Sequence, residues 1–171
     1  YRVNLIVDNS RAEGAPVIVD YNPTYYNLVG EVEYDNEYGN LTTDFMKIKP
    51  GLMHKANGGY LILQVQDLLN NVQSWEALRR IIKTREIAIE NLRDQLGGIA
   101  VTTLKPEPIP ADVKVILIGG AYYYDLLRSY DDDFSKLFKI RADFDYEMDR
   151  SGGNIDKIAG FISAFSKNEG T

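Results

Sequence analysis

The chain has 171 residues, of which 44% are hydrophobic and 26% charged, and its formal net charge is -6. This composition is typical of a folded globular domain, and the negative charge argues against nucleic acid as a partner because phosphates are bound by clustered Lys and Arg. The absence of cysteine excludes disulfides, thiol nucleophiles and thiolate metal sites. No apolar run reaches the ~20 residues of a membrane-spanning helix. We therefore expect a cytoplasmic location and no membrane partner.

The first part of the chain alternates short apolar runs with turn residues. Runs of β-branched residues predict strands over 2–8 and 15–20. Asn22, with a proline behind it, predicts the cap of a short helix that ends at Gly30. The acidic, tyrosine-rich stretch over 31–48 predicts a long exposed loop or a hairpin with its tip at DNEYGN. Because the chain starts with Tyr close to an apolar run, we interpret it as a fragment of a longer protein.

The middle of the chain has the pattern of an α/β domain. A proline at its start and glycines at its end predict a short helix over 50–58. Residues 60–65, YLILQV, predict a strand that is covered on both faces of a mostly parallel sheet. Apolar residues at helical spacing predict an amphipathic helix over 74–85, capped by Ser74. A proline-rich connector then leads to a second fully apolar strand over 114–120.

The last part of the chain predicts a helix over 122–130, an acidic turn at 131–133, a strand over 138–145 and an amphipathic helix over 154–167. We interpret the acidic turn as solvated, because it lacks the alternating ligands and glycine of a calcium loop. Strands separated by helices, two of them apolar throughout, predict an α/β protein with a three-layer αβα sandwich.

Six stretches, in this order along the chain, resemble the AAA+ module of Lon-like ATP-dependent serine proteases. They are VDNS, GAPVIVDYNPTYYNLVGEVEY, IKPGLMHKANGGYLIL, WEALRRIIKTREIAIE, LKPEPIPADVKVILIG and YDDDFSKLFKIRADFD. The resemblance implies the AAA+ type of P-loop NTPase fold, with the N-terminal P-loop strand absent from this chain. It implies an α/β core over 1–150 and a terminal helix over 151–171 that leads toward a helical lid or a linker. It also implies a ring, of six subunits as in the family.

The resemblance places Gln64, Val65 and Gly120 where hydrolytic members of the family carry their nucleotide-site groups. Those members have an Asp-Glu pair for Mg²⁺ and the attacking water, and a polar residue that senses the γ-phosphate. An amide coordinates weakly, a Val cannot polarise water and a Gly has no side chain. We interpret Asp67, the nearest carboxylate, as a helix cap. No G-x-x-x-x-G-K-[ST] motif occurs, so we expect no ATP hydrolysis and no cofactor in this fragment.

Other chemistry is also disfavoured by the sequence. Lon-like proteases cut peptides with a Ser-Lys pair in a separate domain, and Ser163 and Lys167 fit the surface of a helix better than such a pair. His54 is the only histidine, so we expect a structural role at a helix end and no metal site. Arg141 is interpreted as an ion-pair residue and not as an arginine finger. We therefore predict no catalytic residue in this chain.

One functional feature of the family has a counterpart here. Lon-like motors grip polypeptide with aromatic residues that follow the second strand of the module, and the resemblance assigns this role to Tyr26, Tyr34 and Tyr38. The partners would then be unfolded polypeptides and other copies of the chain. Solubilising loop tyrosines are the alternative interpretation. Two alternative functions also stay open: an active ATPase or unfoldase with its P-loop upstream of this fragment, and a non-catalytic protein-interaction module.

Overall fold

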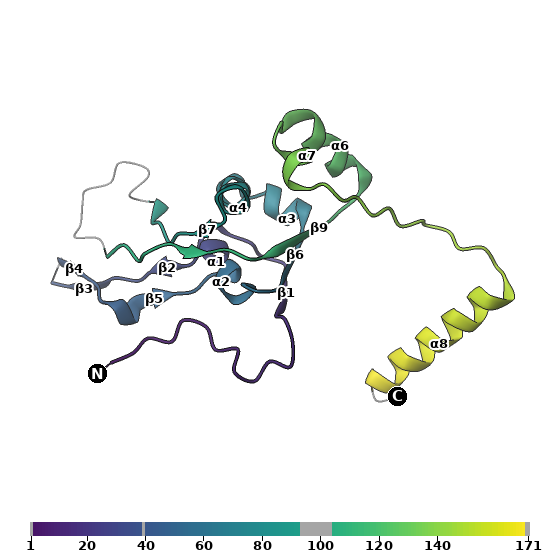
Figure 1. The fold of residues 1–171 in the computed structure, drawn as a ribbon, viewed down its shortest axis with the longest axis horizontal. Helices are drawn as coiled ribbons and strands as arrows, with labels where there is room; N and C mark the ends of the chain where they lie inside the picture. The colour runs from purple at the N-terminus through teal and green to yellow at the C-terminus, as the bar shows by residue number, and fades with distance from the viewer. Residues whose placement is uncertain (1, 39, 93–103, 170–171) are drawn as a thin grey trace. The chain divides into compact units, whose positions relative to one another are not determined.

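The computed structural model describes residues 2–38, 40–92 and 104–169 (Figure 1). The chain forms two compact units, Tyr1–Leu137 and Phe138–Thr171. The first unit contains all of the strands and most of the helices. Each unit is described by itself below.

A three-stranded parallel sheet forms the centre of the first unit. It consists of β1 (Val17–Asp20), β6 (Tyr60–Gln64) and β9 (Lys114–Ile118), in the order β1-β6-β9. In the ladders, Val19 is paired with Ile62, which is paired in turn with Ile116. Side chains alternate between the two faces of a strand, so Leu61 and Leu63 share the opposite face, where both are fully buried. The sequence predictions of these three strands are confirmed.

Short helices provide the rest of the core. Among the described residues, the helices of this unit are α1 (Tyr25–Val29), α2 (Leu52–Lys55), α3 (Val65–Leu69), α4 (Val72–Thr84), α6 (Ala121–Tyr130) and α7 (Phe134–Leu137). Leu28, Leu68 and Leu78 are inaccessible to solvent; α4 contacts α1 and α3, and α3 contacts β6. Helix α4 ends at Arg85, whose φ of 58° is in the left-handed region.

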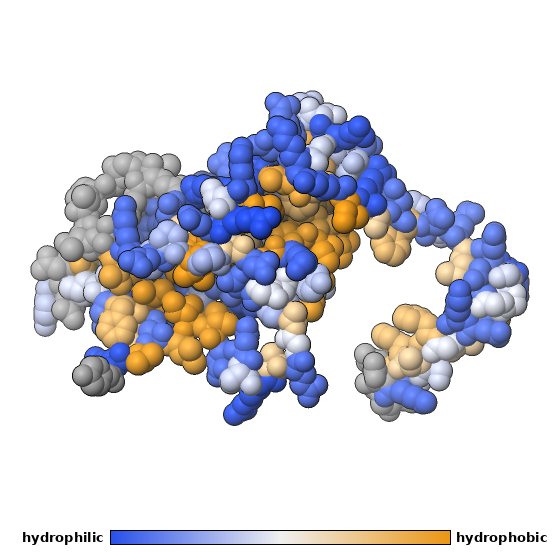
Figure 2. Space-filling view, viewed as in Figure 1, coloured by the Kyte–Doolittle hydropathy of each residue, from blue (hydrophilic) through white to orange (hydrophobic). Residues whose placement is uncertain are grey.

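The other face of the sheet is partly open to solvent. Ile116 is 43% exposed and Ile118 is 48% exposed, and Val17 and Val19 of β1 are exposed as well. Figure 2 shows apolar surface gathered over this part of the molecule. The prediction that 60–65 is covered on both faces is therefore wrong for the described residues. A run of apolar residues indicates a strand in the sheet, but it does not tell which side of the sheet the rest of the chain covers.

A long antiparallel ribbon leaves the sheet after α1. Its strands near the sheet are β2 (Glu31–Val32) and β5 (Ile48–Lys49), and its outer strands are β3 (Asp35–Glu37) and β4 (Asn40–Thr42). A 3-10 helix, Phe45–Lys47, lies between β4 and β5. Lys47 Nζ forms an ion pair with Asp35 Oδ1 across the ribbon at 2.9 Å. The hairpin predicted around DNEYGN is thus confirmed.

Two glycines bring the backbones together at the base of the ribbon. Gly30 has a φ of 87°, and a Cβ on it would lie 2.5 Å from the carbonyl oxygen of Lys49. A Cβ on Gly51 would collide with the backbone of Leu28 and with the nitrogen of Gly30. The end of α1 and the start of α2 therefore touch through main-chain atoms, with no room for a side chain on either glycine.

Two of the predicted strands are wrong. Residues 2–8 contain no strand and are held instead by Asn4, whose Nδ2 donates to the carbonyls of Phe45 at 2.8 Å and Ile48 at 3.2 Å. Residues 138–145 are extended but have no ladder partner among the described residues. β-Branched composition favours an extended backbone, but a strand also needs a neighbouring strand to pair with.

Three predicted caps are also wrong. Thr24, and not Asn22, caps α1, because its Oγ1 accepts a backbone N–H of the first turn at 3.3 Å. Helix α4 begins earlier than predicted, with Asn71 at its N-cap, so Ser74 is a buried residue inside the first turn. Asp67 lies within α3 and is not at its cap. Local sequence rules indicate residues that can cap a helix, but the tertiary structure decides where the chain turns.

The second unit contains an extended segment and one helix, α8 (Gly152–Glu169). The spacing of Ile155, Ile158, Phe161, Ile162 and Phe165 places them on one side of α8. The rings of Phe161 and Phe165 stack with centroids 6.2 Å apart. The predicted last helix is confirmed. Among the helices of the described residues, none has both the length and the hydrophobicity that are required to cross a bilayer.

Candidate functional site

The carboxyl ends of the parallel strands meet at one edge of the sheet. Gln64 is the last residue of β6 and is paired with Ile118, the last residue of β9. Val65 follows Gln64 directly as the first residue of α3, and Gly120 follows Ile118 after one residue as the N-cap of α6. The structure thus brings the three predicted nucleotide-site positions, Gln64, Val65 and Gly120, to one edge. This edge is where α/β proteins usually bind their ligands.

Val65 is a core residue. Its side chain is only 4% exposed, and it packs against the backbone of Gly119. A Cβ on Gly119 would collide with Val65 Cγ1, so the two residues fit together only because position 119 has no side chain. The side chain at position 65 is therefore used for packing, and it presents no polar group at the strand edge.

The polar groups at this edge do not fit a catalytic Mg²⁺. Gln64 contributes an amide, and the carboxylate of Asp20, at the end of β1, accepts the N–H of Asn22 at 2.8 Å. Gly120 contributes only backbone atoms, and its carbonyl accepts the N–H of Tyr123 at 3.1 Å. Within the described ranges, no group of three or more His, Asp or Glu side chains could hold a metal ion.

The three candidate tyrosines of the ribbon region lie in different environments. Tyr38 occupies the turn between β3 and β4 with a φ of 52°, and it is completely exposed, at 107% of the reference area. An aromatic ring at the tip of a hairpin, with no surface of the described chain covering it, is available to a passing molecule. A positive φ is uncommon for a residue other than glycine, so this backbone geometry could not be predicted from the residue type.

Tyr34 and Tyr26 make contacts within the fold. Tyr34 is half-buried, and its Oη accepts a hydrogen bond from Asn91 Nδ2 at 3.2 Å. This bond joins the ribbon to the segment that follows β7 (Glu86–Ile87). Tyr26 is half-buried in α1, and its ring meets that of Tyr25 edge to face with centroids 5.5 Å apart. Tyr34 therefore links the ribbon to this segment, Tyr26 belongs to α1, and Tyr38 is the tyrosine at the tip of the ribbon.

The acidic turn after α6 is a structural site that the sequence analysis missed. Asp131 is buried, whereas the sequence predicted a solvated turn. Its Oδ2 accepts from Trp75 Nε1 at 3.1 Å and from an Arg79 terminal nitrogen at 2.5 Å, both on α4. Burial alone would raise the pKa of Asp131, but the hydrogen bonds from Arg79, the Asp133 N–H and Trp75 outweigh it and lower that pKa. The turn thus connects α6 and α7 to α4.

Arg141, which was weighed as an arginine finger, and Lys136 form local ion pairs. Arg141 Nε donates to Asp143 Oδ1 at 2.7 Å, as expected for an ion-pair residue. Lys136 Nζ lies 3.4 Å from Asp133 Oδ1, which also pairs with Lys83 through its other oxygen. These contacts are within the unit to which each residue belongs.

Comparisons with known proteins identify a family. The LonB-like AAA domain family matches residues 13–145. A protein of Escherichia coli (strain K12) that is named as a Lon protease homolog is 32% identical over 77 residues, which are 42% of this chain and 12% of that protein. A protein of Haemophilus influenzae with the same name is 45% identical over 40 residues, 23% of this chain and 7% of that protein. These matches thus cover a small part of each relative.

Among solved structures, the crystal structure of NtrX from Brucella abortus has a TM-score of 0.45 and 18% sequence identity with this chain. The match covers 77% of this chain and 26% of that chain. The sequence comparisons, and not this structural similarity, carry the assignment.

Proposed function

The chain belongs to the LonB-like AAA domain family, and we propose that it is a non-hydrolysing member that binds unfolded polypeptide and assembles into a ring. Its mixed α/β fold with a parallel sheet is that of an AAA-type domain. The matched relatives are named as Lon protease homologs, which supports a role beside a peptidase domain in a longer protein. We propose that this peptidase is of the serine type and that the protein is cytoplasmic. In that role the ring, of six subunits, would admit polypeptide to a proteolytic chamber.

The loss of ATP hydrolysis is supported by Val65. A residue that orients water must carry a polar group and reach the strand edge. Val65 is apolar and fills the space beside Gly119. With an amide at Gln64 and only backbone at Gly120, this edge would supply neither the metal ligand nor the base of a hydrolytic member.

Polypeptide binding is supported by one observation, the complete exposure of Tyr38 at the tip of the ribbon. Aromatic rings contact apolar and backbone groups of many sequences over a large area, so an exposed ring can hold unfolded chains without sequence preference. The ion pair between Lys47 and Asp35 and the Tyr34–Asn91 hydrogen bond would hold the ribbon that carries this ring.

Binding of a fluorescent, reduced and alkylated lactalbumin, measured by anisotropy, tests this proposal. Tyr38→Ala should weaken binding by about fivefold, because one aromatic contact contributes ~1 kcal/mol. Tyr130→Ala is the matched control, since Tyr130 is 85% exposed on α6 and away from the ribbon. Equal binding by the Tyr38 variant and the native chain would overturn the role of the ribbon. Steady, Mg²⁺-dependent phosphate release from ATP by the native chain would overturn the loss of hydrolysis.

A further inference from the structure

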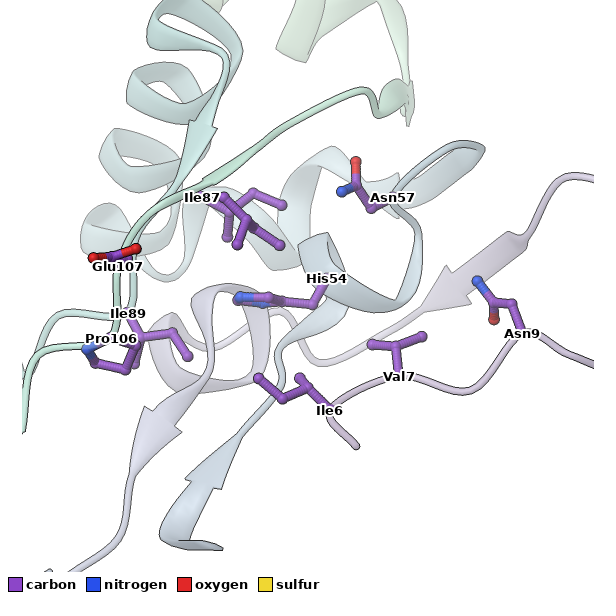
Figure 3. A pocket seen from close by; sticks show the side chains of 10 residues that line it. Ile6, Val7, Asn9, His54, Asn57, Ile87, Ile89, Pro106 and Glu107 are labelled. Carbon is purple, nitrogen blue, oxygen red and sulfur yellow. The ribbon is translucent and has the colours of Figure 1, made fainter. Parts of the chain in front are cut away.

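A cavity of about 300 Å³ lies in the first unit, near the amino ends of the parallel strands (Figure 3). His54 and Asn57 line it shortly before β6 begins, and Ile109 lines it shortly before β9 begins. Gln64 is the last residue of β6 and Gly120 comes shortly after β9, at the opposite ends of these strands. The cavity is therefore distinct from the nucleotide-site edge. Its apolar lining consists of Ile6, Val7, Ile87, Ile89, Pro106 and Ile109.

Hydrogen bonds hold the walls of this cavity in place. Asn4 fixes the N-terminal segment that carries Ile6 and Val7 through its two bonds to backbone carbonyls. Asn57 Nδ2 donates to the carbonyl of Pro110 at 3.0 Å, and its Oδ1 accepts the N–H of Asp112 at 2.8 Å. The cavity is thus preformed, which reduces the entropy that a ligand must overcome on binding.

His54 provides a buried polar group that faces this cavity. It is only 6% exposed, and its Nδ1 accepts the N–H of Gly51 at 3.3 Å. An accepting Nδ1 carries no proton, so the neutral ring has its proton on Nε2. Among the described residues, Nε2 has no hydrogen-bond partner, and Figure 3 shows the ring extending among the cavity residues toward Pro106 and Glu107. The ring lines the cavity, so a ligand in the cavity can accept a hydrogen bond from this N–H.

The charges around the cavity decide which acceptor fits. Burial lowers the pKa of His54, so the ring is neutral at neutral pH and does not attract an anion. Glu107, whose side chain is exposed, places a negative charge at the mouth of the cavity. A carboxylate ligand would be repelled there, whereas a neutral carbonyl is suited to the His54 N–H and a cation is suited to Glu107.

We infer that this cavity binds an apolar side chain of an extended polypeptide, with an adjacent backbone carbonyl accepting from His54 Nε2 and a neighbouring basic residue near Glu107. A peptide supplies the apolar group and the neutral carbonyl together, and the volume is at the lower end of the range for ligand sites, about 300 Å³. The site adds a second, side-chain-selective contact to the proposed function. It does not depend on Tyr38.

The single histidine of the chain makes this inference directly measurable. In the ¹⁵N-labelled protein, the two imidazole nitrogens of His54 give one set of signals, and titration with acetyl-Leu-Lys-amide should shift the Nε2 signal to saturation. Acetyl-Ser-Lys-amide should bind about tenfold more weakly, because it lacks the apolar side chain. Acetyl-Leu-Glu-amide should also bind more weakly, because of Glu107. Equal shifts with all three peptides, or no shift with any, would overturn the inference.

Two variants complete the test. Ile109→Arg should block the cavity and abolish the shift of the Nε2 signal. Ile116→Arg, on the open face of the sheet, is the control and should leave this shift unchanged. Both variants should fold, because Ile109 is 39% and Ile116 43% exposed. Glu107→Gln should remove the difference between the Lys and Glu peptides. If a Tyr38→Ala variant keeps the peptide shift and binds unfolded lactalbumin as tightly as the native chain, only the proposed role of the ribbon is contradicted. If the protein bound the Leu and Ser peptides equally well, only the proposed role of the cavity would be contradicted.

Discussion

The side chain of Val65 occupies the space that a side chain on Gly119 would need. The first residue of α3 and the first residue after β9 are therefore coupled by packing, at the edge where a hydrolytic relative would hold its nucleotide. Residue 65 cannot be exchanged for a catalytic acid without disturbing this contact.

The first prediction concerns restoring the acid at this position. Val65→Glu should lower the free energy of unfolding by about 3 kcal/mol, because it places a charge in a buried, apolar site. Gln66→Glu is the matched control, since Gln66 is exposed and adjacent, and it should change stability by less than about 0.5 kcal/mol. Urea unfolding followed by circular dichroism measures both. If Val65→Glu were as stable as the native chain and released phosphate from ATP, the packing role of Val65 would be refuted.

A second prediction concerns Asp131 and pH. Its pKa is lowered from 3.8 in the folded chain, so its ionised form stabilises the fold above the unfolded pKa, and this contribution is lost as pH falls through the folded value. Asp131→Asn should cost about 2 kcal/mol at neutral pH, since it removes charge-assisted hydrogen bonds to Trp75 and Arg79. The difference from the native chain should stay constant down to about pH 5 and shrink as the pH falls below about 4.

Asp132→Asn is the control for this prediction, because Asp132 is exposed in the same turn. Its unfolding free energy should follow that of the native chain at every pH. A native-minus-variant difference for Asp131→Asn that stays constant with pH would show that the carboxylate contributes by shape and not by charge.

The open face of the sheet leads to a third prediction. Ile116 and Ile118 expose adjacent apolar surface, and large exposed apolar patches promote association. The isolated chain should therefore show concentration-dependent light scattering, which the Ile116→Lys, Ile118→Lys double variant should reduce. Val72→Lys is the control, since Val72 is exposed on α4 and away from this face. Equal scattering by the two variants and the native chain would exclude the sheet as the cause.

The sequence was sufficient for features that are determined locally. Apolar runs predicted β6 and β9, and the turn residues of DNEYGN predicted the tip of the ribbon. The resemblance placed Gln64 and Gly120 at strand ends, and the structure brings them to one edge. Each of these predictions depends on residues that are close together in the chain, where propensity and periodicity are informative.

Features that depend on distant residues were missed. Asp131 looked like part of a solvated turn because its partners, Trp75 and Arg79, precede it by more than fifty residues. The β-branched run over 2–8 has strand composition, but it is anchored by a side chain instead of a ladder. His54 was expected to be structural, and its bond to Gly51 agrees, but the cavity around it is formed by three separate segments. No local pattern encodes such an assembly.

The contact between Gly30 and Gly51 has a mechanical consequence for the ribbon. The two strands nearest the sheet begin and end at these glycines, where main chain meets main chain and no flexible side chain lies between. A pull on Tyr38 would therefore be transmitted along the ribbon to α1 and α2 with little slack. A displacement of the ribbon would therefore also move these two helices, which contribute to the core of the domain.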